Sequence, residues 1–95
     1  MTEMLVEFVK NLANSLMTNG LTMRGPELAI QLNQNGFTTI RGTEYKRGRG
    51  IYAVLTSVWR RLKARGLDND AENVALAFVN SDGSHAWRQK AEREE

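Results

Sequence analysis

The chain has no cysteine, one proline and one histidine among its 95 residues. Without cysteine it can form no disulfide framework, thiolate nucleophile or cysteine-based metal site. No apolar run approaches the length that spans a bilayer. The segment from Met1 to Lys10 carries Glu3 and Glu7 and lacks the basic start of a secretory signal. We therefore expect a cytoplasmic protein with no membrane partner.

Residues suited to catalysis are also scarce. His85 is the only histidine, and no paired carboxylate accompanies it at a recognisable ligand spacing. Asp68, Asp70 and Glu72 alternate, but the glycine and the terminal glutamate of a calcium loop are missing. No arrangement of a nucleophile and a base is visible. We expect no enzymatic activity, no bound metal and no cofactor.

The charges are unevenly distributed along the chain, although the net charge is only +2. Residues 20–66 carry nine basic side chains against two acidic ones, a net +7, whereas residues 1–19 sum to −1 and residues 67–95 to −4. Such segregation predicts one positive face, for which a polyanion is the natural partner. A solvated basic surface without a partner would give the same pattern, so charge alone leaves both readings open.

Three segments have the apolar periodicity of amphipathic helices. Thr2 is a plausible N-cap for the first helix, and Pro26 fits the first turn of the second. Gly20, Gly36 and Gly66 are suited to ending the three helices in turn. The residues expected in the core are Leu5, Phe8, Val9, Leu12, Leu16 and Met17, then Leu28, Ala29 and Leu32, then Ile51, Leu55, Val58 and Leu62, a stripe widened by Val54 and Trp59.

The remaining segments predict a small β element and further turns. Residues 69–80 fit either a helix or a buried strand, and their alanine content and spacing favour the helix. Ser84 to Arg88 is expected to form a short strand beside Thr38 to Ile40. The expected fold is mainly α, with three or four helices in a helix-turn-helix, winged-helix-like arrangement and at most two short strands. Residues 1–88 would form the single domain and residues 89–95 a frayed, charged tail.

The segment before the third helix carries the strongest functional signal. Lys46, Arg47 and Arg49 alternate with Gly48 and Gly50 there. Cations oppose the positive end of a helix dipole, so an arrangement chosen for stability alone would place acidic residues instead. Free backbone N–H groups, close-approach glycines and Arg side chains together suit a phosphate. A mobile basic loop that binds nothing is the alternative.

Other polar and basic residues on either side of this segment could also contact nucleic acid. Thr38 and Thr39, next to Arg41, are suited to phosphates or base edges, or equally to turns and strands. Arg60 and Arg61 lie off the apolar stripe of the third helix and could touch flanking phosphates or only face solvent.

The order of residues 26–62 resembles the recombinase-type DNA-binding domain of large serine recombinases, and more generally a winged helix-turn-helix protein from phages and plasmids. The resemblance rests on Leu32-Asn33, Gly36, Thr39, the pair Arg41-Gly42 and an aromatic residue before the next helix. The family usually has Trp at that aromatic position, where this chain has Tyr45, and Lys46 to Gly50 lengthen the approach to the third helix. No catalytic domain is covered, so the resemblance implies duplex binding and not strand exchange.

The expected function is binding of double-stranded DNA, as a small transcriptional regulator or an accessory factor of a phage or plasmid. The resemblance implies that the third helix reads the major groove from its N-terminal end. A protein-interaction factor that binds a host or phage protein, and an RNA-binding protein, remain alternatives. A homodimer also stays open, because half-site readers often dimerise but no heptad seam is present. The resemblance implies that Arg41, Lys46, Arg47, Arg49 and Tyr52 face the DNA and that Thr38 and Thr39 touch its backbone. With the flanking Arg60 and Arg61, these are the expected DNA-binding residues.

Overall fold

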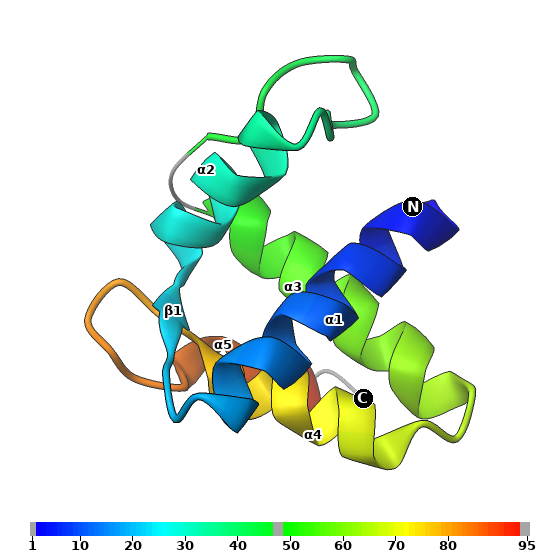
Figure 1. Ribbon diagram of the computed structural model, residues 1–95, viewed down its shortest axis with the longest axis vertical. Helices are drawn as coiled ribbons and strands as arrows, with labels where there is room; N and C mark the ends of the chain where they lie inside the picture. Colours follow the sequence, from blue (N-terminus) through cyan, green and yellow to red (C-terminus); the bar gives the residue numbers. More distant parts are fainter. Residues whose placement is uncertain (1, 47–48, 94–95) are drawn as a thin grey trace.

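The computed structural model describes residues 2–46 and 49–93, which form five helices and two short strands (Figure 1). The elements in chain order are α1 (Glu3–Thr18), β1 (Met23–Arg24), α2 (Gly25–Gln34), α3 (Arg49–Ala64), α4 (Asp68–Ala77), β2 (Phe78–Val79) and α5 (Ala86–Arg93). The prediction of a mainly α fold with a small two-stranded element is confirmed.

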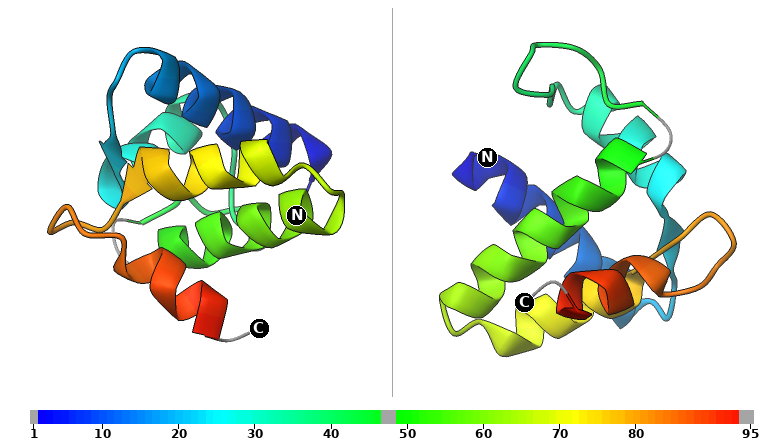
Figure 2. Two further views of the ribbon diagram at one scale, coloured as in Figure 1. Left: turned by 90° about the horizontal axis from the view of Figure 1, so that it is seen from below. Right: turned by 180° about the vertical axis from the view of Figure 1, so that it is seen from behind.

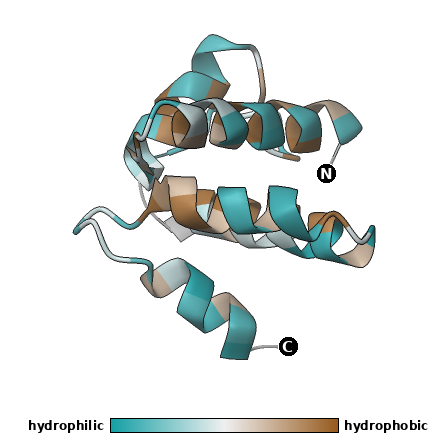
Figure 3. Ribbon diagram, turned by 60° about the horizontal axis from the view of Figure 1, so that its bottom comes forward, coloured by the Kyte–Doolittle hydropathy of each residue, from teal (hydrophilic) through white to brown (hydrophobic). Residues whose placement is uncertain are grey.

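The helix α4 packs against both α1 and α3, and the left view of Figure 2 shows it between them. The helix α2 packs against α3, and β1 and β2 lie beside α2. The helix α5 contacts α3 at the edge of the domain, where Figure 3 shows it as mostly hydrophilic. None of the helices in the described ranges is long and apolar enough to cross a membrane.

The core consists of the apolar stripes that periodicity predicts, with small adjustments. The expected residues of α2 and α3, Trp59 included, are buried, except Val54, which is only partly buried. On α1 the stripe is turned, so that Val6 and Ala13 are buried while Phe8, Leu12, Leu16 and Met17 are only partly buried. The fully or nearly buried residues of the other elements are Ala71, Val74, Ala75, Ala77, Phe78, Val79, Trp87 and Ala91.

Helix ends follow the expected capping residues. The backbone N–H of Leu5 donates to Thr2 Oγ1 at 3.3 Å, which caps α1. Pro26 lies in the first turn of α2. Gly36 follows α2 with φ of 81°, a left-handed conformation that glycine adopts without the steric cost of a side chain.

The β element differs from the prediction in both of its strands. Met23 pairs with Phe78 and Arg24 with Val79, in parallel. Residues 38–40 and 84–88 therefore do not form the predicted strand pair, and the parallel pair is not the antiparallel hairpin of a wing. Residues 69–80 combine both expected alternatives, because α4 ends at Ala77 and the chain continues directly into β2.

The C-terminal segment is helical where a strand and a frayed tail were expected. The helix α5 continues to Arg93, and Trp87 and Ala91 bury one face of it. The indole N–H of Trp87 donates to the carbonyl oxygen of Phe78 at 2.7 Å, which ties α5 to β2. Trp87 and Ala91 are buried while Gln89 between them is exposed; a strand would place all three on one face, so this pattern fits a helix.

Candidate nucleic-acid interface

One face of α3 is exposed between two surface hollows. Gly50, Ala53 and Ser57 are all exposed, and their spacing of three and four residues places them on one side of the helix. We call these three residues the α3 strip. Ala53 and Ser57 line both hollows, so the strip runs between them. Because its side chains are small, the helix backbone can approach a bound molecule closely.

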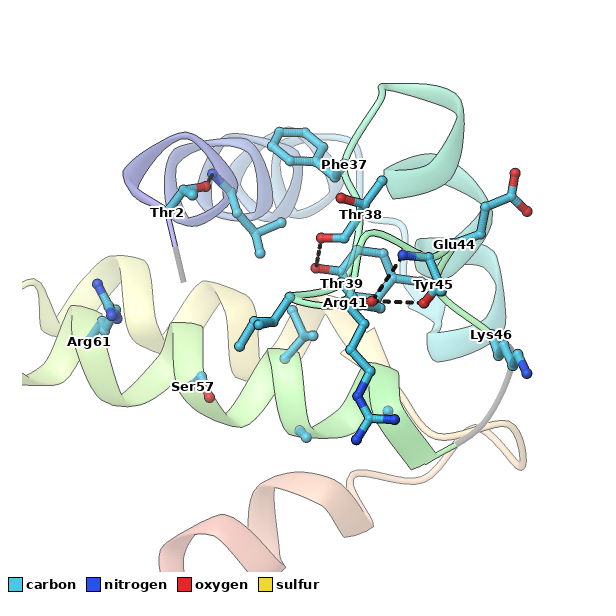
Figure 4. Close-up of a pocket in the computed structure, with 16 residues that line it drawn as sticks. Thr2, Phe37, Thr38, Thr39, Arg41, Glu44, Tyr45, Lys46, Ser57 and Arg61 are labelled. Atoms are coloured by element: carbon cyan, nitrogen blue, oxygen red, sulfur yellow. Dashed lines mark hydrogen bonds between the residues drawn. The ribbon is translucent and has the colours of Figure 1, made fainter.

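The first hollow lies between the α3 strip, the start of α1 and the loop that follows α2. Its volume is about 940 Å³. Arg41, Lys46 and Arg61 line it, and Figure 4 shows Arg41 extending from the loop toward α3 while Arg61 lies farther along the helix. Within the described ranges, Arg41 and Lys46 form no ion pair, whereas Arg61 Nη1 lies 3.9 Å from Glu3 Oε1.

The second hollow lies between the α3 strip and α5. Arg60 lines it from α3 and Lys90 from α5, so cations border the α3 strip on this side as well. Tyr52 also lines this hollow and lies half-buried, with its hydroxyl 3.2 Å from Ser81 Oγ. The end of the Tyr52 ring packs so closely on Gly25 that a Cβ at this glycine would lie 2.7 Å from it.

The loop that lines the first hollow contains a tight, hydrogen-bonded turn. The backbone N–H of Gly42 donates to the carbonyl oxygen of Thr39 at 2.9 Å. The backbone N–H of Thr39 in turn donates to the carbonyl oxygen of Thr43, also at 2.9 Å. The hydroxyls of the two threonines lie 2.8 Å apart. Ile40 and Arg41 occupy the centre of this turn, which we call the 39–43 turn.

The base of the loop is anchored to α2 through Asn33. Its Nδ2 donates to the carbonyl oxygen of Tyr45 at 2.9 Å, and its Oδ1 accepts from the backbone N–H of Tyr45 at 2.7 Å. The Tyr45 hydroxyl donates to the carbonyl oxygen of Thr38 at 3.1 Å. Burial raises the pKa of Tyr45, so the hydroxyl keeps the proton that this bond requires.

A second anchor joins the loop to α1. The rings of Phe8 and Phe37 lie with their centroids 5.2 Å apart, at an interplanar angle of 51°. Tilted contacts of this kind add to the stabilisation that burial alone provides. The 39–43 turn is therefore held in place from two helices.

Several other basic side chains have partners inside the protein. Arg65 pairs with Glu3, and this hydrogen bond holds the pKa of the Glu3 carboxyl below its usual value. Lys63 lies over the ring of Trp59, with Nζ 5.8 Å from the centroid. Arg88 pairs with acidic residues of α4 and α5. These cations stabilise the fold and are poor candidates for phosphate contacts.

The structure divides the predicted site residues between the two hollows. Thr38, Thr39, Arg41, Lys46 and Arg61 line the first hollow. Tyr52 and Arg60 line the second, so the site is broader than the basic loop alone. Arg47 and the side chain of Arg49 lie outside the described residues.

Sequence reasoning did not select three residues that the structure brings into the site. Asn33 positions the loop through contacts with the backbone of Tyr45, a role that its place in the Leu32-Asn33 pair did not indicate. Lys90 reaches the second hollow only because α5 is a helix. Ser57 lies at the C-terminal end of the α3 strip, and its place opposite the buried stripe of α3 was the available signal.

Comparison of the chain with protein-family models, with curated proteins and with solved structures finds no match.

Proposed function

We propose that this protein binds double-stranded DNA through the α3 strip and the cations on either side of it. The supporting observation is that Lys46 and Arg61 border the strip on one side, and Arg60 and Lys90 on the other. The major groove is about 12 Å wide and admits an α-helix with a phosphate backbone on each side. A helix with basic residues along both flanks matches that arrangement of charge.

The small side chains of the strip suit close docking against base edges. Ser57 can donate to or accept from a base, and the methyl group of Ala53 can contact a thymine methyl group. In this arrangement phosphate contacts supply most of the affinity, and the strip supplies the sequence preference. The wider role as a regulator or accessory factor remains the hypothesis that the sequence resemblance suggests.

The test is fluorescence anisotropy with a labelled random-sequence duplex at several salt concentrations. We expect log affinity to fall linearly with log salt, with a slope of about −0.9 for each phosphate contacted. Lys46→Ala and Lys90→Ala should each make this slope about one phosphate shallower. No binding to the duplex at low salt would refute the proposal. If the protein instead bound single-stranded RNA or a protein partner, that alternative function would take its place.

Lys10→Ala is the matched control for these two variants. It removes one positive charge from α1, where Lys10 pairs with Glu7 at 3.0 Å and lines neither hollow. We expect its salt slope to equal that of the wild-type protein. If Lys10→Ala weakens binding as much as Lys46→Ala does, net charge and not the proposed surface controls the interaction.

A further inference from the structure

The side chain at the tip of the 39–43 turn faces solvent completely. Ile40 is 100% exposed, and it is the most exposed of the large apolar residues that the structure describes. Single exposed apolar residues are common on protein surfaces and need no explanation by themselves. Ile40 differs because it occupies the centre of a closed turn whose base is fastened to α1 and α2.

This turn presents its apolar side chain beside a cation and a hollow bordered by cations. Arg41 follows Ile40 directly, and both line the first hollow together with Lys46. A held turn loses little conformational freedom on binding, so the contact of its tip can contribute fully to affinity. Cations around the tip favour an anionic surface over an apolar protein pocket as the partner.

We propose that the 39–43 turn enters the minor groove of the duplex, with Ile40 wedged against a base step and Arg41 lying in the groove. This inference rests on the proposed function. Apolar wedges of this kind unstack a base step and bend the duplex, and narrow minor grooves attract arginine. Because the turn and the α3 strip line the same hollow, a helix docked in the major groove brings the turn to the neighbouring backbone, beyond which the minor groove begins.

The experiment measures bending of a duplex labelled with a donor and an acceptor at its two ends. We expect the wild-type protein to increase energy transfer, and netropsin, which occupies the minor groove, to abolish that increase. Ile40→Ala should remove the bending and weaken duplex binding by about tenfold, as expected when an aliphatic contact is lost. Leu21→Ala is the control, because Leu21 is 57% exposed and lines neither hollow.

The outcomes separate this inference from the proposed function. If the wild-type protein binds with steep salt dependence but Ile40→Ala binds and bends the duplex equally well, the wedge is wrong and duplex binding stands. If the wild-type protein binds no duplex, both proposals fail. A concentration-dependent dimer that Ile40→Ala dissociates would overturn the wedge by assigning Ile40 to a second copy of the chain.

Discussion

The anchoring of the loop by Asn33 can be tested by removing its side chain. Asn33→Ala deletes the two hydrogen bonds to Tyr45, of 2.9 and 2.7 Å, and leaves the N–H and carbonyl groups of Tyr45 without these partners. Each hydrogen bond contributes about 0.5–1.5 kcal/mol net, so the variant should lose about 1–3 kcal/mol of unfolding free energy. The end of the loop at Tyr45 should loosen from α2, whereas the end at Phe37 keeps its ring contact with α1 and its backbone bond to Leu32.

Urea unfolding and hydrogen exchange measure these two effects separately. At an m-value of about 1–3 kcal/mol per molar urea, a loss of about 2 kcal/mol lowers the unfolding midpoint by roughly 1 M. The backbone amide of Tyr45 should exchange faster under native conditions, because it loses its acceptor. Asn35→Ala is the matched control, since it deletes one exposed hydrogen bond of 2.7 Å, which the Asn35 side-chain amide donates to the carbonyl oxygen of Gln31.

The reasoning predicts a functional result as well as a structural one. Asn33→Ala leaves the α3 strip and its flanking cations in place but releases the 39–43 turn. Duplex binding should therefore persist with weaker affinity, and duplex bending should be lost. The interpretation would be refuted if Asn33→Ala matched Asn35→Ala in stability and kept the Tyr45 amide protected.

Two further predictions concern the contacts that hold the helices together. Trp87→Phe removes the indole donor to the carbonyl oxygen of Phe78 and part of the packing of the larger ring. We expect a loss of about 1–3 kcal/mol in urea unfolding, and a loss below about 0.5 kcal/mol would contradict this view. The folded-state pKa of Glu3 lies below its usual value of 4.5 because Arg65 donates a hydrogen bond to its carboxylate. The contribution of this pair to folding stability is therefore fully present above about pH 4.5, and it is lost as the pH falls through the lowered pKa. The stability difference between wild type and Glu3→Gln should therefore shrink on acidification below that value, and a difference independent of pH would exclude the pair as its source.

Long periodic segments made most of the fold predictable from the sequence. The stripe Ile51, Leu55, Val58 and Leu62 is buried as expected, because a helix that packs on one side must repeat its apolar residues with the helical period. The helix ends were predictable for a similar reason, since Thr2 and Gly36 cap or end their helices through local backbone geometry. These features depend only on neighbours in the chain.

The errors arose where contacts join distant parts of the chain. Strands β1 and β2 have two residues each, too few to show any alternation, and their pairing joins Met23 to Phe78. For α5 the helical signal was the pair Trp87 and Ala91, but the segment is so polar that this signal is weak beside the charged residues around it. The Asn33 anchor is a contact between a side chain and a distant backbone, and such contacts leave no periodic trace.

The structure also gives a physical meaning to the residues on which the recombinase resemblance rests. Leu32 is buried in the core, Asn33 fastens the backbone of Tyr45, and Gly36 and Gly42 adopt positive φ where the chain turns. Of the residues in this pattern, Asn33, Tyr45, Gly36 and Gly42 hold or turn the loop, Arg41 lines the first hollow, and none belongs to the α3 strip. Under the proposed function, this pattern presents the 39–43 turn beside α3, while the choice of DNA sequence depends on the α3 strip. Substitutions in the α3 strip should therefore change which duplexes are preferred, whereas substitutions in the pattern should weaken binding to all of them.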